Sequence, residues 1–415
     1  MNALSIIGKE RLKGEIKISR MKNSALPIIF ACALVKAPCV LRNIPRVSDV
    51  EKAIELLNSM GAIAEFIDSN TLFIDTKTMS CEIKCPQLIS QMRASSYLMG
   101  VLLSRFGEVN MPFPGGCNFG SRPIDLHIKG FRDLGAICQI SDEIISIKTI
   151  KKLNSTKITL DKISVGATIN MVLATCMLEG TSEIINVAKE PHVDDLISFL
   201  CSCGAKIKRV GNSIIVNGVS SLNSTDYTIL PDTIEALTYL TFLGITMGEL
   251  TLTNVVTSQL KCGTRVLDKM GMKIKFNNDQ LHAVVDSKLK GQVVITEPYP
   301  GFPTDLHPQF ASLLCFCSTP GAIIEKVFPT RFQYVNELKK ASVTIVNVGN
   351  TVYTQPSKTK SCTLDATDLR AGAALVALAL GTEGKCIINN VNYIVRGYEN
   401  LVEKLTSVGG NIKQI

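Results

Sequence analysis

The chain has 415 residues, which is more than one hydrophobic core usually organises, so we expect two or three domains. Its composition, 46% hydrophobic and 19% charged, is that of an ordinary globular protein and excludes the disordered and fibrous classes. The formal net charge of +8 suits an anionic ligand, but it also fits lysines spread over a large solvated surface. Charge alone therefore does not choose a function.

Three features bear on the compartment in which the chain works. The most apolar stretches, 236–248 and 371–381, are shorter than the roughly 20 residues that span a bilayer. The first residues lack the basic flank, apolar run and cleavage site of a secretory signal, so export is not expected. The 14 cysteines are scattered among apolar residues without metal-ligand spacing. We expect most of them to be buried thiols in a reducing cytoplasm.

One unit recurs along the chain at a spacing of roughly 70 residues. Each copy predicts an amphipathic helix, a Gly-Ala-like turn and short strands. In the first copy Ser48 and Glu51 fit a capping box and Gly61 a left-handed helix end; in the third copy Pro191 fits a first turn and Gly204 the end. The copies turn at 57–63, 132–137, 200–207, 267–274, 338–345 and 405–412.

A second class of helix alternates with the first and is apolar nearly all round. A helix without a polar face must be buried on every side. Polar residues stand at the starts of these helices, and Ser164, Asp232, Thr304 and Thr367 are expected to act as N-caps. The six predicted helices are 25–34, 95–103, 167–178, 236–245, 310–317 and 371–380.

Cations also stand at the starts of three of these helices. Lys22, Arg93 and Arg370 oppose the helix macrodipole, so capping does not explain them. A helix N-terminus combined with Lys or Arg predicts a site for phosphates and carboxylates. Six units divide most simply into two domains of three, with the helix N-termini facing a shared cleft.

A glycine-rich loop carries one cysteine in a setting unlike that of the others. The segment 114–127 begins Pro-Gly-Gly-Cys, which places Cys117 in a tightly turned or mobile loop. Arg122 and His127 follow within ten residues and could lower the pKa of the Cys117 thiol. A reactive thiol at this position is therefore a candidate for chemistry.

The whole segment resembles the active-site loop of the UDP-N-acetylglucosamine 1-carboxyvinyltransferase family, and further family-like motifs follow along essentially all of the chain. The resemblance implies an α/β fold of two inside-out α/β barrel domains, each with three βαβαββ repeats around central buried helices, as in EPSP synthase. The N-terminal domain would be 22–229 with the cysteine loop at 112–123, and the C-terminal domain 1–21 plus 230–415. The motifs are Lys22 to Pro27, Met92 to Ser95, Asp161 to Thr168, Glu190-Pro191, Phe302 to Asp305, Thr367 to Arg370 and Arg396 to Glu399.

The resemblance also implies a reaction. The enolpyruvyl group of phosphoenolpyruvate would move to the 3'-hydroxyl of UDP-N-acetylglucosamine by addition and elimination, with release of phosphate. This is the first committed step of peptidoglycan synthesis, carried out in the cytoplasm without a metal or organic cofactor. The partners would be these two small molecules, not nucleic acid or membrane, and fosfomycin would alkylate Cys117.

The family's site residues carry over by motif. Cys117 would be the general acid, Asp305 the base for the sugar hydroxyl, and Asp368 a catalytic support that orients Lys22 or Arg396 by ion pairing. Lys22, Arg122 and Arg396 would lie near the phosphate, and Arg331 and Arg370 near the carboxylate. The sugar nucleotide would meet Asn23, Arg93, Pro123, Asp125, Leu126, His127, Lys162, Ser164, Val165, Gly166 and the backbone of Val327.

Several alternatives stay open from the sequence. The chain could be a 3-phosphoshikimate 1-carboxyvinyltransferase, although the Pro-Gly-Gly-Cys loop argues against it, or a low-activity paralogue. A ring-shaped nucleic-acid clamp would also fit six repeats and positive charge. His127 could contact the nucleotide or serve as a structural hydrogen bonder. Departures from the family pattern stand at Arg20-Met21, Thr233, Pro329-Thr330, Lys340-Ala341 and Val395.

Overall fold

The computed structural model describes residues 3–115 and 124–415, and these residues form two compact units. The N-terminal unit comprises 20–115 and 124–230, and the C-terminal unit comprises 3–19 and 231–415. Three predicted site residues, Cys117, Arg122 and Pro123, lie outside the described residues. Within the described ranges, no helix combines the length and apolar character needed to cross a membrane.

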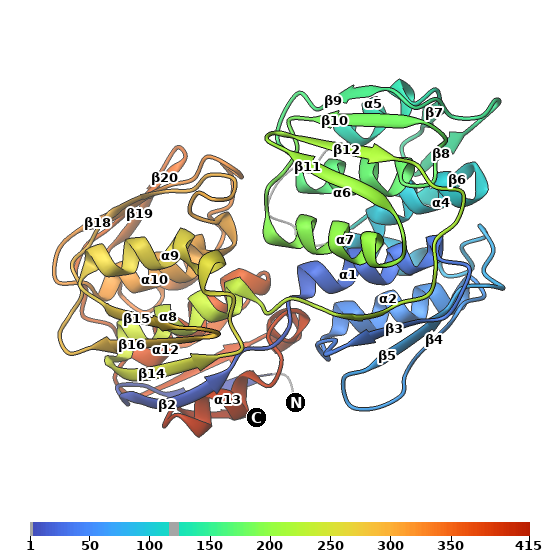
Figure 1. Cartoon of the computed structure of the whole chain (residues 1–415). Coiled ribbons are helices and arrows are strands. Elements are labelled where there is room, and N and C mark those ends of the chain that lie inside the picture. The colour runs from blue at the N-terminus through green and yellow to red at the C-terminus, as the bar shows by residue number, and fades with distance from the viewer. Residues whose placement is uncertain (1–2, 116–123) are drawn as a thin grey trace. The chain divides into compact units, whose positions relative to one another are not determined.

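Each sheet of the chain follows one plan, which the third repeat of the N-terminal unit shows in full (Figure 1). Its strands are β9 (Lys157–Thr159), β10 (Thr181–Ile185), β11 (Lys206–Val210) and β12 (Ser213–Asn217), in the order β11-β12-β10-β9. The first two strands are parallel and β12 is antiparallel to both of its neighbours. Helices α6 (Val165–Thr175) and α7 (Pro191–Ser202) connect them, so the repeat reads βαβαββ.

The N-terminal unit contains two more sheets of this kind. One has the order β13-β3-β5-β4 and the other β6-β8-β7, without a fourth strand among the described residues. The strands are β3 (Cys39–Arg42), β4 (Ile63–Phe66), β5 (Leu72–Asp75), β6 (Glu108–Pro112), β7 (Ile137–Ile140), β8 (Ile144–Lys148) and β13 (Asp226–Thr228). The helices are α1 (Lys22–Ala31), η1 (Cys32–Leu34), α2 (Ser48–Ser59), α3 (Pro86–Gln91), η2 (Arg93–Tyr97), α4 (Leu98–Phe106) and α5 (Asp125–Asp133).

The C-terminal unit repeats the plan three times and takes two strands from the start of the chain. Its sheets have the orders β15-β16-β14-β2, β17-β18-β20-β19 and β21-β22-β1-β23. The strands are β1 (Ala3–Ile7), β2 (Leu12–Lys17), β14 (Gly248–Thr253), β15 (Lys273–Asn277), β16 (Gln280–Val285), β17 (Val293–Ile295), β18 (Gly321–Ile324), β19 (Ile345–Val348), β20 (Thr351–Thr354), β21 (Thr363–Asp365), β22 (Lys385–Asn389) and β23 (Asn411–Gln414). The helices are α8 (Thr233–Thr246), α9 (Thr257–Met270), η3 (Thr304–Leu306), α10 (His307–Phe316), α11 (Tyr334–Lys339), α12 (Leu369–Gly381), η4 (Val391–Arg396) and α13 (Leu401–Ser407).

The two predicted helix classes are confirmed. The apolar class forms α1, α4 and α6 in one unit and α8, α10 and α12 in the other, and all 13 residues of α12 are buried. The amphipathic class forms α2, α5, α7, α9, α11 and α13. The ladders join strands within six separate sheets, so among the described strands neither unit is one continuous hydrogen-bonded barrel.

Most of the predicted helix ends are confirmed. Gly61 and Gly204 adopt φ of 92° and 97°, a region that favours glycine. Pro191 is the first residue of α7. The side chains of Ser164 and Asp232 accept backbone N–H groups in the first turns of α6 and α8.

The predicted capping box at the start of α2 is wrong. Val47 occupies the N-cap position without a side-chain hydrogen bond, and Ser48 is already inside the helix. A serine with helical backbone angles cannot turn its hydroxyl back onto the first turn as a cap does. Glu51 instead forms an ion pair with Arg46 at 3.1 Å.

Two further cap predictions are wrong by one or two residues. Asp368, not Thr367, caps α12, because its Oδ1 accepts from the N–H groups of Arg370 and Ala371 at 2.8 and 3.0 Å. Thr304 lies in η3, and its hydroxyl donates to Glu325 instead of capping α10.

Candidate active site

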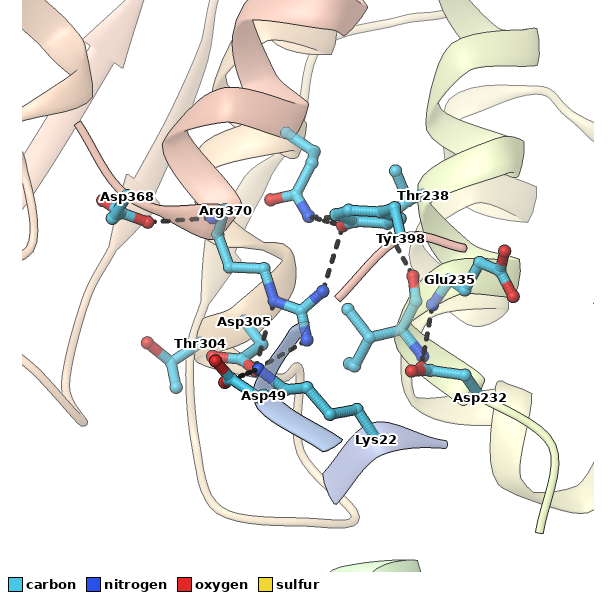
Figure 2. Close-up of polar contacts among 12 residues, drawn as sticks. Lys22, Asp49, Asp232, Glu235, Thr238, Thr304, Asp305, Asp368, Arg370 and Tyr398 are labelled. Carbon is cyan, nitrogen blue, oxygen red and sulfur yellow. Dashed lines mark hydrogen bonds and ion pairs between the residues drawn. The ribbon is translucent and has the colours of Figure 1, made fainter. Parts of the chain in front are cut away.

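A carboxylate between two arginines, Arg331 and Arg370, forms the centre of the candidate site in the C-terminal unit, and Figure 2 shows it with Arg370. Asp305, in η3, accepts from Arg331 Nη1 at 2.9 Å through Oδ1. Its Oδ2 accepts from Arg370 Nη2 at 3.1 Å and from Arg370 Nε at 3.3 Å. Three residues predicted for the site from separate motifs are thus in direct contact.

The electrostatics of this cluster are set by the two guanidinium groups. Burial by itself would raise the pKa of Asp305, but Arg370 and Arg331 outweigh it and hold the pKa well below that of an ordinary carboxyl. The Asp305 side chain keeps 28% exposure, whereas those of Arg331 and Arg370 keep 3% and 5%. The arginines are therefore fixed cations in a mostly dry setting, with an ionised carboxylate at the solvent side.

Arg370 is oriented by a hydrogen-bond network of buried polar side chains from other segments of the unit. Its Nη1 donates to the Tyr398 hydroxyl at 3.1 Å. That hydroxyl lies 3.0 Å from Thr238 Oγ1 and accepts from Gln309 Nε2 at 3.0 Å. All four side chains are buried. With Asp368 capping the first turn of α12, both the backbone and the side chain of Arg370 are held in place.

Two other predicted site residues of the C-terminal unit are Arg396 and Val327. Arg396 ends η4 and is half-buried. Val327 is half-buried, and its amide donates to Glu325 Oε1 at 2.7 Å, so this N–H group is engaged within the protein. A ligand contact through the Val327 backbone stays a prediction.

Among the described residues of the N-terminal unit, Lys22 is the predicted phosphate cation. It begins α1, and its Nζ lies 3.0 Å from Asp49 Oδ2 in α2 (Figure 2). The two side chains keep only 13% and 5% exposure. Asp49 thus fixes the direction of a cation that would otherwise be mobile, and no motif in the sequence indicated it.

The predicted nucleotide residues gather in part at the start of α6. Ser164 caps this helix, and a Cβ added to Gly166 would lie 3.1 and 3.2 Å from Cε1 and Nε2 of the His127 ring. A side chain at position 166 would therefore press against the His127 ring, a reason for glycine that the sequence did not show. Of the rest, Asn23, Arg93, Leu126 and Val165 are half-buried, and Asp125 and Lys162 are exposed.

His127 is a buried and hydrogen-bonded residue. Its Nδ1 lies 2.8 Å from Asn170 Nδ2, and the Asn170 Oδ1 accepts from the amide of Gly100 at 2.7 Å. The amide group of Asn170 is thereby oriented, so His127 Nδ1 accepts and the ring proton sits on Nε2. Burial, together with the nearby Arg93, lowers the pKa of His127 to about 3, which keeps the ring neutral. A nucleotide contact through Nε2 stays a prediction.

Two departures from the family pattern have structural partners of their own. Arg20 Nη1 donates to the carbonyl of Ile229 at 2.9 Å, which ties together the two places where the chain enters and leaves the N-terminal unit. Thr233 Oγ1 donates weakly to Gln259 Oε1 at 3.4 Å. Neither contact involves Asp305, Arg331 or Arg370.

The fold of the chain matches that of solved enolpyruvyl transferase structures. A solved structure of the enolpyruvyl transferase NikO from Streptomyces tendae matches with a TM-score of 0.90 at 24% identity, over 99% of this chain and 98% of that one. EPSP synthase from Acinetobacter baumannii matches with a TM-score of 0.76 at 17% identity, over 100% and 99%. The fold is that of the enolpyruvyl transferases.

The sequence comparisons show the family to which the chain belongs. The model of the family EPSP synthase (3-phosphoshikimate 1-carboxyvinyltransferase) matches residues 6–405. A UDP-N-acetylglucosamine 1-carboxyvinyltransferase of Halothermothrix orenii is 42% identical over 416 residues, covering 100% of both chains. The chain therefore belongs to the EPSP synthase family of transferases and, within it, to the UDP-N-acetylglucosamine 1-carboxyvinyltransferases. This membership favours an enzyme over the nucleic-acid clamp.

Proposed function

We propose that the chain transfers the enolpyruvyl group of phosphoenolpyruvate to the 3'-hydroxyl of UDP-N-acetylglucosamine and releases phosphate, in the cytoplasm, as the committed step of peptidoglycan synthesis. The observation that supports this most directly is the Asp305–Arg331–Arg370 cluster in a chain that is 42% identical over its whole length to a UDP-N-acetylglucosamine 1-carboxyvinyltransferase. Two fixed cations suit a carboxylate substrate, and a carboxylate suits a hydroxyl nucleophile.

The reaction balances in two stages. In the addition, a proton joins the methylene carbon of phosphoenolpyruvate, the sugar oxygen bonds to C2, and the hydroxyl proton passes to a base. In the elimination, the bond from C2 to the phosphate oxygen breaks, a proton leaves the methyl group, and phosphate departs. We assign the acid role to Cys117, the base role to Asp305, and the phosphate contacts to Lys22, Arg122 and Arg396.

To act as a base, Asp305 needs a higher pKa than it has between the two arginines. A carboxylate held between two guanidinium groups with a depressed pKa is a weak base. The carboxylate of phosphoenolpyruvate would compete with Asp305 for Arg331 and Arg370. Sharing these cations with a second anion raises the pKa of Asp305 and lets it turn to the sugar hydroxyl. Asp305 would thus become an effective base only when phosphoenolpyruvate is bound.

Phosphate release is the decisive assay. We expect phosphate from phosphoenolpyruvate with UDP-N-acetylglucosamine and none with shikimate 3-phosphate. Release with shikimate 3-phosphate alone would overturn the assignment in favour of 3-phosphoshikimate 1-carboxyvinyltransferase. A kcat far below the typical range of 1–1000 per second would identify a low-activity paralogue.

Covalent labelling tests the thiol independently. Fosfomycin is expected to add its mass once per chain, at Cys117, and Cys117→Ser should abolish the adduct. Peptide mass spectrometry that finds the adduct at another of the 14 cysteines would remove Cys117 from the site.

A further inference from the structure

Glu325 is a fully buried carboxylate to which the proposed reaction gives no role. It follows β18 directly, and its side chain has 0% exposure. Its Oε1 accepts from the amides of Val327 and Phe328 at 2.7 and 2.8 Å and from Thr296 Oγ1 at 2.8 Å. Its Oε2 accepts from Thr304 Oγ1 at 2.9 Å. These hydrogen bonds join separate chain segments, and we call Glu325 with its four donors the junction.

Two of those segments carry the groups of the candidate site. Thr304 immediately precedes Asp305, and the turn at 327–328 leads to Arg331. Arg331 Nη1 in turn donates to the carbonyl and hydroxyl of Thr304 at 3.0 and 3.2 Å. Glu325 therefore binds the two chain segments that carry Asp305 and Arg331.

The environment keeps Glu325 ionised. Burial would raise its pKa, but the His307 ring and the surrounding donors outweigh burial and lower the pKa below that of an ordinary glutamate. His307 Nδ1 lies 3.1 Å from Oε2, and the Tyr334 hydroxyl lies 2.7 Å from His307 Nε2. A buried charge is costly unless it is paired and hydrogen-bonded, and the donors around Glu325 meet this requirement.

We propose that Glu325 is a positioning residue of the transferase, which sets the spacing of Asp305 and Arg331 by holding Thr304 and the 327–328 turn in one hydrogen-bonded junction. Because the role rests on the proposed function, its test needs one readout of catalysis and one of structure.

Glu325→Gln is the informative variant, since it keeps the side chain's shape. The amide carbonyl can still accept from Val327 and Phe328, but the NH2 group replaces the oxygen that accepts from Thr304 and lies beside His307, so the Thr304 hydroxyl loses its acceptor. We expect kcat/KM for phosphoenolpyruvate to fall by about 10- to 100-fold, as small misplacements in active sites do. The Kd for UDP-N-acetylglucosamine, measured by calorimetry without phosphoenolpyruvate, should stay within about twofold.

Thr354→Val is the matched control. It removes one partly buried hydrogen bond, from Thr354 Oγ1 to the Gly321 carbonyl at 3.1 Å, which joins β20 to the start of β18, whereas Glu325 follows the end of β18. It should lower the Tm as much as Glu325→Gln while leaving kcat/KM unchanged. Equal kinetics for both variants at equal loss of Tm would overturn the positioning role and leave Glu325 as a residue of stability only.

A double-mutant cycle tests whether Glu325 and Thr304 affect catalysis through the same hydrogen bond. Thr304→Val breaks the junction from its other side, so its effect and that of Glu325→Gln on kcat/KM should not add. Additive effects would mean that the two residues act separately, against the inference.

Hydrogen exchange separates this inference from the proposed function. In Glu325→Gln the amides of Val327 and Phe328 keep only a neutral acceptor, which binds them less strongly than the carboxylate, so they should exchange faster than in the wild type, whatever reaction the enzyme performs. Unchanged exchange would refute the junction. Faster exchange in a protein that releases no phosphate with UDP-N-acetylglucosamine would refute only the assigned reaction.

Discussion

At the scale of single residues, Asp305 links stability to pH. Its folded-state pKa lies below the unfolded value of about 3.9, so it stabilises the fold above that pH, and this contribution is lost as the pH falls through and below it. Asp305→Asn should lower the free energy of unfolding by about 1–3 kcal/mol at pH 7, because two buried arginines lose their counter-charge. Urea unfolding between pH 3 and 7 should give a flatter pH dependence for the variant than for the wild type. Parallel curves would show that the carboxylate's charge is not stabilising.

The pair of Lys22 and Asp49 gives a second prediction at this scale. Asp49→Asn removes a charge-assisted hydrogen bond that directs the lysine, and such bonds contribute about 1.5–3 kcal/mol. We therefore expect KM for phosphoenolpyruvate to rise about tenfold or more. Glu51→Gln is the control, since Glu51 stands on the same helix with 48% exposure and pairs with Arg46 instead. Identical KM values for both variants would contradict a directing role for Asp49.

At the scale of elements, substitutions at the start of α12 distinguish two roles of Asp368, a helix cap and an ion-pairing support of the site. Asp368→Ala should cost about 0.5–2 kcal/mol of stability and lower kcat, because the capped turn carries Arg370. Serine is also a good N-cap, so Asp368→Ser should restore most of the stability. If Asp368 acts only through the cap, kcat recovers with the Tm. Recovery of the Tm without recovery of kcat would instead favour the role in which the Asp368 charge orients Lys22 or Arg396 by ion pairing.

The elements themselves were the most predictable part of this chain. Periodicity indicated all six apolar and all six amphipathic helices, because the local spacing of apolar residues reveals whether a helix is buried on one side or on every side. The caps at Ser48 and Thr367 were predicted wrongly, since a cap depends on where one residue's backbone leaves the helix. Asp305, Arg331 and Arg370 were predicted by motif, whereas Glu325, Gln309 and Asp49 were missed. These three contact the site only through tertiary packing, and no local pattern marks such contacts.

At the scale of the whole molecule, the first residues of the chain complete the unit that its last residues build. β1 lies between β22 and β23 and is antiparallel to both, so a strand at the start of the sequence joins two strands near its end. The side chain of Ile6 is fully buried, while that of the next residue, Ile7, is 42% exposed. Adjacent isoleucines on opposite faces of one strand therefore offer a matched pair of substitutions.

Ile6→Ala should lower the free energy of unfolding by about 2–5 kcal/mol, the usual cost of emptying a buried isoleucine site. Ile7→Ala should change it by about 0.5 kcal/mol or less. Because the chain divides into two units, we expect the loss to be local: hydrogen exchange in Ile6→Ala should accelerate in β1, β22, β23 and α12 but not in β10 and β12 of the N-terminal unit. Acceleration throughout both units would show that they unfold together, and equal effects of the two substitutions would contradict the placement of β1 in the sheet.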